Sequence, residues 1–158
     1  MEIVCSTDSK YIMPTGIMLL SLFESNRGEV VNVHLLHDHD SAALLDPIRA
    51  IAASYQQNIH FYLINDDIFE HFPIGLDFQL DHVGTSFATY YRLYLTEILP
   101  ADIDKVIYLD GDILVVDKLV KLWNTSVENY AIAAVPDSYN NKIEHYKRLR
   151  HPQTLGYF

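Results

Sequence analysis

The sequence lacks several features that would assign it to a secreted, membrane or disulfide-stabilised class. Its 158 residues include one cysteine, Cys5, so no intrachain disulfide can form and a reducing compartment, the cytoplasm, is expected. The opening MEIVCSTDSK has no basic region followed by an apolar stretch, which argues against a secretory signal. The apolar run Ile17–Phe23 is too short to cross a bilayer, so no membrane span is expected.

Positive charge and glycine-rich loops are also scarce. Lys and Arg number 11 against 21 Asp and Glu, and a surface with this formal net charge of -10 repels nucleic acid and anionic membranes. It also repels a nucleotide phosphate unless a divalent cation or a few placed cationic groups bridge the two. Neither G-x-G-x-x-G nor a Walker pattern occurs, so groups other than a glycine cradle must hold any bound phosphates.

What the sequence does contain is an alternation of strand-like and helix-like segments. At 49% hydrophobic residues the chain can bury one sizeable core, and the alternation predicts a single α/β domain with a mostly parallel sheet. The predicted strands are Glu2–Ser6, Val30–Leu36, Asn58–Ile64, Lys105–Leu109, Ile113–Val116 and Tyr130–Val135. The predicted helices are Met13–Asn26, Ser41–Gln56, Ser86–Leu99 and Tyr139–Arg150, with a short one capped by Asn65 or Asp66. Within the second helix, Asp46-Pro47 fits an N-cap followed by proline at the first helical position.

Polar residues follow the first predicted strand directly. Ligands of parallel α/β sheets collect at the carboxyl ends of the strands, and Ser6, Thr7, Asp8 and Tyr11 lie there. These residues fit a nucleotide pocket in which Asp8 accepts from a base or ribose and Tyr11 stacks on the base. Ser, Thr and Asp are equally good helix N-caps, and both interpretations stay open.

Three Asp-x-Asp triplets occur, and their surroundings differ. Asp102-Ile103-Asp104 lies in a polar loop after a proline and fits solvated turn residues. Asp38-His39-Asp40 looks like a metal cluster, but it falls between a strand and a helix, where capping is the simpler interpretation. Asp110-Gly111-Asp112 stands between two apolar runs.

The third triplet has two interpretations. Asp-Gly between apolar runs is typical of a tight hairpin. The flanking VIYL and ILVV are apolar on both faces, as in strands buried from both sides, where two carboxylates are costly unless they are hydrogen-bonded, protonated or bound to a cation. Adjacent carboxylate oxygens suit Mg²⁺ or Mn²⁺, and glycine lets the backbone approach a ligand closely. We favour the metal site.

Taken together, these motifs resemble a known family. IVCSTDSKY, TSFATYYRLYLTEILP, DKVIYLDGDILVVDKLVKLWN and AAVPDSY match, in order and spacing, the retaining glycosyltransferases of family eight, which include bacterial lipopolysaccharide galactosyl- and glucosyltransferases and general stress protein A. The resemblance implies a GT-A fold, a Rossmann-like and mainly parallel sheet that binds a UDP-sugar through Mn²⁺ or Mg²⁺. It further implies transfer of a hexose, with retention of configuration, to an acceptor hydroxyl of a glycan, glycolipid or glycoprotein, such as a lipopolysaccharide.

The resemblance also assigns roles to individual residues. The donor-binding positions are Ser6, Thr7, Asp8, Tyr11, Arg92, Asp110, Gly111 and Asp112. Among these, Asp110 and Asp112 match the metal-binding pair and Arg92 an arginine that contacts the donor diphosphate. Asp137 matches an acidic residue on the acceptor side. Lys10 stands where some relatives have Asn, so that contact of the uridine pocket is not carried over.

Helical periodicity bears on Arg92 independently of the resemblance. On a helix, Ala88, Thr89, Arg92 and Thr96 share a small polar face, while Tyr91, Leu95 and Ile98 share an apolar one. Arg92 therefore points away from the core, either toward a ligand or simply into solvent.

The resemblance leads us to expect that residues 1–158 are the N-terminal, nucleotide-sugar-binding part of a single glycosyltransferase domain. The family's catalytic residues and its histidine metal ligand are then expected beyond Phe158. Two alternatives remain: a fragment that binds nucleotide sugars without turnover, and a haloacid-dehalogenase-type phosphohydrolase, whose nucleophile is the first Asp of an Asp-x-Asp pair.

Overall fold

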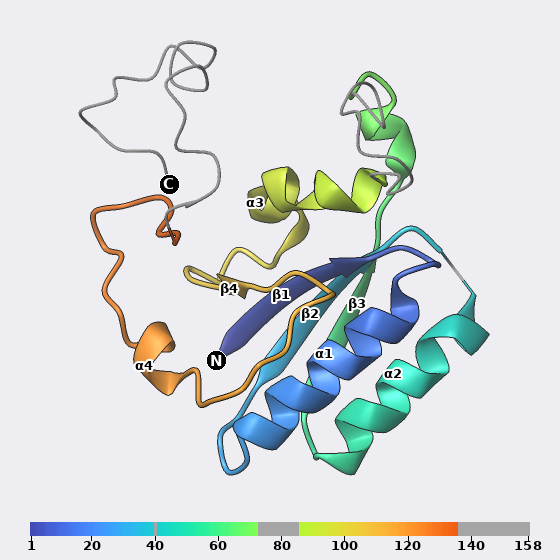
Figure 1. Cartoon of the computed structure of the whole chain (residues 1–158). Helices are drawn as coiled ribbons and strands as arrows, with labels where there is room; N and C mark the ends of the chain where they lie inside the picture. Colours follow the sequence, from blue (N-terminus) through green and yellow to red (C-terminus); the bar gives the residue numbers. More distant parts are fainter. Residues whose placement is uncertain (40, 73–85, 136–158) are drawn as a thin grey trace, which may run out of the picture. The chain divides into compact units, whose positions relative to one another are not determined.

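A four-stranded parallel sheet forms the centre of the protein. The structure, a computed structural model, describes residues 1–39, 41–72 and 86–135, and the chain divides into two units, Met1–Trp123 and Asn124–Phe158. The sheet belongs to the first unit and has the order β3-β2-β1-β4 (Figure 1). Its strands are β1 (Glu2–Thr7), β2 (Asn32–His37), β3 (Asn58–Leu63) and β4 (Ile107–Tyr108). All pairings are parallel, which confirms the predicted α/β sheet.

Two helices cover one face of this sheet. Helices α1 (Ile12–Ser25) and α2 (Ala42–Ser54) lie side by side there (Figure 1). Alternate strand residues such as Ile3, Cys5 and Val33 are fully buried against them, as the two-residue period of a strand requires. Burial raises the pKa of the Cys5 thiol to about 12, so this cysteine stays protonated and serves as a small apolar core residue.

The opposite face is covered by short helical segments. They are η1 (Asp66–Phe69), η2 (Phe87–Thr89), η3 (Tyr91–Tyr94) and α3 (Leu95–Ile98). Val4 and Leu36 of the sheet pack with Phe69, Ala88 and Tyr91 in a second buried cluster.

The prediction of one continuous helix over Ser86–Leu99 is therefore wrong. The rings of Phe87, Tyr90, Tyr91 and Tyr94 all lie with their centroids 5.1 to 6.4 Å from that of Phe69. Residues seven positions apart on a straight α-helix are separated by about 10 Å along the axis. The chain bends into separate turns, which lets both ends of this aromatic stripe reach one ring. Ala88 also belongs to the buried side rather than to the polar face predicted for it.

Two predictions of where a helix begins had different outcomes. Asn65 caps η1 as predicted, and its side-chain oxygen accepts from the Asp67 amide at 3.0 Å. The assignment of Asp46 and Pro47 to a helix start is wrong, because α2 begins at Ala42 and contains Pro47. The apolar residues before the proline extend the buried stripe of α2, and packing against the sheet outweighs the backbone hydrogen bond that proline cannot donate.

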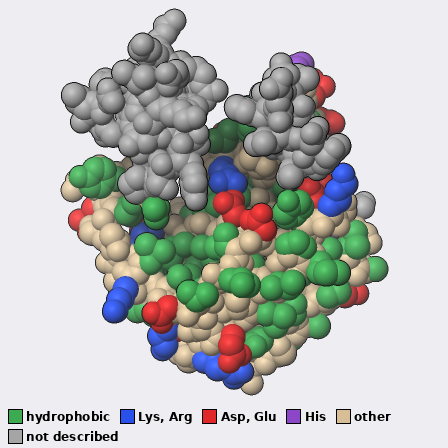
Figure 2. All heavy atoms as spheres, viewed as in Figure 1, with side chains coloured by type: hydrophobic (Ala, Val, Ile, Leu, Met, Phe, Trp, Pro, Cys, Tyr) green, Lys and Arg blue, Asp and Glu red, His purple; other side chains and the backbone are tan. Residues whose placement is uncertain are grey.

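The segment Ile113–Val116 is not a strand, contrary to prediction. It lies along α1, whose side chains replace a neighbouring strand as hydrogen-bond partners. The Val115 amide donates to Ser21 Oγ at 2.9 Å, and Ser25 Oγ donates to the Val115 carbonyl at 2.8 Å. The segment leads to α4 (Val120–Trp123), a helix that was not predicted. Figure 2 shows apolar side chains gathered on the viewed face of the molecule. The exposed apolar side chains of α1 and of this segment include Met13, Ile17, Leu20, Leu114 and Val116.

In the second unit the structure describes residues 124–135. The predicted strand Tyr130–Val135 is not formed there, and the Tyr130 amide instead closes a local turn onto the Val127 carbonyl at 2.9 Å. A strand needs a hydrogen-bonded neighbour in addition to β-branched residues. The predicted helix Tyr139–Arg150 lies outside the described residues. Within the described ranges, no helix is long and apolar enough to cross a membrane.

Candidate functional site

The carboxyl ends of β1 and β4 bring two predicted binding segments together. The strands pair in parallel with Val4 opposite Tyr108, and the Leu109 amide donates to the Val4 carbonyl at 2.9 Å. Ser6, near the end of β1, and Asp110, two residues after β4, therefore lie at the same edge of the sheet. This edge is where ligands of parallel α/β sheets bind.

Arg92 reaches the same edge from η3. Its Nη2 donates to Asp110 Oδ1 at 2.7 Å, and its Nε donates to the Thr89 carbonyl at 3.0 Å. The guanidinium carbon lies 4.4 Å from the centroid of the Tyr108 ring, within the range of a cation–π contact. The Arg92 and Asp110 side chains are 40% and 52% exposed, so both remain accessible to a ligand. The structure thus places two predicted donor-binding residues in direct contact.

Tyr108 was missed by the sequence analysis. Its hydroxyl shares a hydrogen bond of 2.6 Å with Ser6 Oγ, while its ring contacts Arg92. Burial raises the pKa of the Tyr108 phenol, against the opposing effects of the Ser6 hydrogen bond and the Arg92 charge, so the hydroxyl stays protonated at neutral pH. A signal for this residue exists in the sequence, because Tyr108 is a polar-tipped residue of the predicted strand Lys105–Leu109, two positions before Asp110.

Gly111 holds the turn between the two aspartates against the rest of the site. A Cβ atom at this position would lie 2.6 Å from Thr15 Oγ1 and 3.3 Å from the Ser6 carbonyl oxygen. Thr15 is fully buried and donates to Thr7 Oγ1 at 3.1 Å. The glycine therefore permits a close approach between parts of the protein, whereas the predicted close approach was to a ligand.

Two premises about this turn need correction. Asp110 and Asp112 are exposed, so their carboxylates are not buried between apolar strands as the flanking residues predicted. The hairpin is also absent, because no strand follows the turn among the described residues up to position 135. Exposed carboxylates pay little desolvation cost, which leaves the turn stable without a bound cation.

Asp8 is not the N-cap of α1, a position that Tyr11 occupies without a side-chain cap, and instead its carboxylate orders the turn before that helix. Its Oδ1 accepts from the backbone amides of Lys10 and Tyr11 at 2.8 and 2.9 Å. Asp8 is 9% exposed and Tyr11 is 37% exposed. A carboxylate with one oxygen engaged by backbone can still accept from a ligand with its other lone pairs.

A second contact fixes η3 from its other side. The Tyr91 hydroxyl donates to Asp66 Oδ1 at 2.5 Å, and the Tyr91 side chain is fully buried. Burial first and the Asp66 hydrogen bond second raise the pKa of Tyr91 far above its ordinary value. Tyr91 and Arg92 are consecutive, so η3 is anchored to the end of β3 by one residue and to the end of β4 by the next.

The remaining Asp-x-Asp triplets lie in different settings. Asp102 and Asp104 are exposed, as predicted for solvated turn residues. At the end of β2, His39 pairs with Asp38 at 2.8 Å, and the His39 carbonyl lies 2.6 Å from His37 Nδ1. Over the described part of the chain, no group of three or more His, Cys, Asp or Glu residues forms a ready-made metal site. Asp40 and Asp137 lie outside the described residues.

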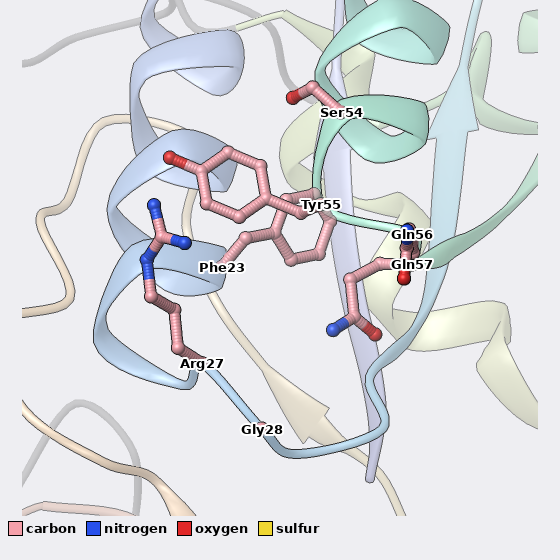
Figure 3. Close-up of a pocket in the computed structure, with 7 residues that line it drawn as sticks. All are labelled: Phe23, Arg27, Gly28, Ser54, Tyr55, Gln56 and Gln57. Carbon is pink, nitrogen blue, oxygen red and sulfur yellow. The ribbon is translucent and has the colours of Figure 1, made fainter.

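A pocket of about 300 Å³ lies away from this edge, at the carboxyl ends of α1 and α2 (Figure 3). Its lining residues are Phe23, Arg27, Gly28, Ser54, Tyr55, Gln56 and Gln57. Its charged group is already paired, because Arg27 makes two 2.9 Å hydrogen bonds to Glu24, and Tyr55 donates to the same carboxylate at 2.8 Å. None of the predicted site residues lines this pocket.

Comparison with solved structures defines the class of the fold. The galactosyltransferase LgtC, solved in complex with donor and acceptor sugar analogues, superimposes with a TM-score of 0.77 at 32% identity, over 94% of this chain and 51% of that one. The match confirms the predicted GT-A fold with its mostly parallel sheet.

Sequence comparison identifies the family. The family described as glycosyl transferase family 8 matches residues 2–158, and the chain belongs to this family. A protein of Haemophilus influenzae assigned to the glycosyltransferases is 30% identical over 100% of this chain and 46% of its own length. The lipopolysaccharide 1,2-glucosyltransferase of Escherichia coli K12 is 23% identical over 100% of this chain and 45% of its own length. The chain thus spans about half the length of these relatives, and membership of the family leaves no place for the phosphohydrolase alternative.

Proposed function

We propose that residues 1–158 are the N-terminal, nucleotide-sugar-binding part of one domain of a retaining glycosyltransferase. The donor is a UDP-hexose, and the acceptor is a hydroxyl of a cell-surface glycan or lipopolysaccharide-type molecule. One observation carries this proposal: Ser6, Arg92 and Asp110, from three separate elements, meet at the carboxyl edge of the sheet through contacts of Tyr108 and Arg92.

The roles of the binding residues follow from where they lie. Ser6 and Thr7 end β1, and Asp8 follows them. Tyr11 is the N-cap of α1 and is 37% exposed, enough for its ring to stack on a uracil. Asp8 accepts from the base or the ribose. Arg92 supplies a fixed cation beside the position of the diphosphate, where its planar fork can donate to phosphate oxygens.

A divalent cation fits the turn Asp110-Gly111-Asp112. Two exposed carboxylates on one short turn are hard oxygen ligands of the kind that Mn²⁺ and Mg²⁺ take together with substrate phosphates and water. The described residues offer no third acidic or histidine ligand at this turn, so Asp110 and Asp112 would supply part of the shell, which nucleotide oxygens and the histidine expected beyond Phe158 would complete. When bound, such an ion supplies positive charge that stabilises a departing diphosphate. Asp110 and Asp112 would hold it, with Asp137 assigned to the acceptor side.

Nucleotide selectivity tests the proposal. We expect the chain to bind UDP in the presence of Mn²⁺ at least about tenfold more tightly than ADP or GDP, which is the value of one or two base-specific hydrogen bonds. Isothermal titration calorimetry measures the three affinities directly, and equal affinities would refute a uridine site. Release of UDP from UDP-glucose or UDP-galactose separates turnover from binding; binding without release would favour the fragment that binds nucleotide sugars without turnover.

A further inference from the structure

Tyr108 makes contacts in two directions that no other described residue of this edge combines. Its hydroxyl reaches across the sheet to Ser6 on β1, at 2.6 Å. The face of its ring receives the Arg92 guanidinium, at 4.4 Å from the ring centroid. Ser6 belongs to the side of the site assigned to the nucleoside, and Arg92 to the side assigned to the diphosphate.

The Arg92 guanidinium makes two hydrogen bonds in addition to its contact with the Tyr108 ring. Thr89 accepts from Nε and Asp110 accepts from Nη2, so the guanidinium is held in its plane by hydrogen bonds and from one face by the ring. If Asp110 turns toward a cation, its hydrogen bond to Arg92 weakens, while the ring and the Thr89 carbonyl remain. The aromatic ring therefore keeps the guanidinium beside the turn whether or not Asp110 is occupied.

The hydroxyl contact fixes the other half. Ser6 is the last residue but one of β1, two positions before Asp8, and its side chain would otherwise be free to rotate between staggered positions. The 2.6 Å hydrogen bond to the Tyr108 hydroxyl restricts this rotation.

We propose that Tyr108 is a positioning residue of the donor site, which holds Ser6 through its hydroxyl and Arg92 through its ring without itself contacting the nucleotide. This inference rests on the proposed UDP-sugar function. The Tyr108 hydroxyl acts on the nucleoside side of the ligand and the Tyr108 ring on the diphosphate side. Substitutions can therefore test the two contacts separately.

Two substitutions make that separation. Tyr108→Phe keeps the ring and removes the hydroxyl, and we expect uridine and UDP affinities to fall together, by about two- to fivefold for one lost neutral hydrogen bond. Tyr108→Leu removes both, and we expect UDP affinity to fall by a further three- to tenfold, about the value of a partly exposed cation–π contact, with no further fall for uridine. The decisive quantity is the ratio of UDP to uridine affinity, which Phe preserves and Leu lowers.

Tyr62 offers a matched control on the same sheet. It is a partly buried strand tyrosine whose hydroxyl also has a partner, His34 Nδ1 at 2.9 Å, and it packs against the same core cluster as Tyr108. Tyr62→Phe and Tyr62→Leu should cost comparable stability and leave the ratio unchanged. If Tyr108→Leu does not fold, Tyr108→Met is used in its place, because methionine fills a similar space and has no ring.

The experiment measures binding of uridine, and of UDP with Mn²⁺, to the wild-type chain and these variants by calorimetry. In addition, the Nε–H resonance of Arg92, recorded without the paramagnetic Mn²⁺ and assigned by its absence in Arg92→Met, should keep its ring-current shift in Tyr108→Phe and lose it in Tyr108→Leu. A ratio and a resonance that do not move in Tyr108→Leu would overturn the inference while the proposed function stands. A wild-type chain that does not bind UDP would overturn the proposed function, and the inference with it.

Discussion

Arg92 Nη2 lies 2.7 Å from Asp110 Oδ1, although the two residues are 18 positions apart in the sequence. The carboxylate that we assign to a divalent cation is therefore neutralised by an arginine that we assign to the nucleotide phosphates. Without metal, this pair explains how a turn with two aspartates stays in place in a chain of net charge -10. The arginine competes with the cation for Asp110, yet it assists the complex of cation and nucleotide.

This competition predicts opposite effects of one substitution. Arg92→Met should strengthen binding of Mn²⁺ alone by about two- to fivefold, the value of an exposed ion pair, because the competing cation is gone. The same change should weaken binding of UDP with Mn²⁺, because a phosphate donor is lost. Calorimetry with and without UDP measures both. Arg49 is the control, since it also pairs with an aspartate, Asp46 at 3.1 Å, and lies over a ring, Phe61 at 4.4 Å, away from this edge. Arg49→Met should change neither affinity.

Removal of one carboxylate should abolish metal dependence. In Asp112→Asn we expect the remaining UDP affinity to be insensitive to chelators, and Mn²⁺ should no longer add to the melting temperature measured with UDP alone. For the parent chain, ligand at about a hundred times its dissociation constant adds about 2.7 kcal/mol to the free energy of unfolding. Asp104→Asn, in an exposed Asp-x-Asp triplet of a neighbouring loop, should behave as the parent. If Asp112→Asn binds Mn²⁺ and UDP as the parent does, the metal site is wrong.

The approach of Gly111 to Thr15 predicts a specific rescue. Gly111→Ala places a methyl group 2.6 Å from the Thr15 hydroxyl, and we expect a loss of about 1–3 kcal/mol in the free energy of unfolding, as in other overpacked sites. Thr15→Ala removes the obstructing oxygen and should reduce the cost of Gly111→Ala. Thr15→Val keeps the bulk and should not. Urea denaturation of the single and double variants measures the coupling, and equal costs of Gly111→Ala in both threonine variants would exclude this contact.

The buried His37 predicts loss of stability in mild acid. Burial is the largest effect and lowers the pKa of His37 below 6.5, against the bond to the His39 carbonyl and the charge of Asp38; His39 and Arg49 lower it further. The unfolded chain then binds a proton near pH 6.5 that the folded chain binds only at lower pH. Stability is therefore full above about pH 6.5 and falls as the pH drops toward the folded-state pKa, by at most about 1.4 kcal/mol per pH unit.

Thermal denaturation between pH 7.5 and 5 checks this sign. His37→Gln should flatten the pH dependence in that window. The Glu2 carboxyl, which is hydrogen-bonded to His34 and Asn32 and has a pKa below 4.5, titrates below this window. A parent chain whose stability is constant from pH 7.5 to 5 would contradict the role of His37.

Local patterns were sufficient for much of this protein. Short apolar runs that are buried on both faces, such as Glu2–Thr7, and longer runs with a wide apolar stripe, such as Ile12–Ser25, specify their own secondary structure and their order predicts a parallel sheet. The Asp110-Gly111-Asp112 motif and its neighbours likewise carried the family, which the comparisons confirm. These features depend on residues close in sequence, where periodicity and side-chain type act directly.

The tertiary structure decided what depends on distant partners. Phe69 gathers rings from residues 87 to 94 and breaks the helix that their periodicity predicted. Ser21 and Ser25 of α1 take the hydrogen bonds of Val115, so an apolar β-branched segment docks on a helix without becoming a strand. Tyr108 acquires its two contacts because β1 and η3 arrive on either side of it. In each case the local preference for helix or strand is worth a fraction of a kcal/mol per residue. Burial of one aromatic side chain, or pairing of one buried backbone group, is worth about 1–3 kcal/mol. The larger contribution therefore determined the structure.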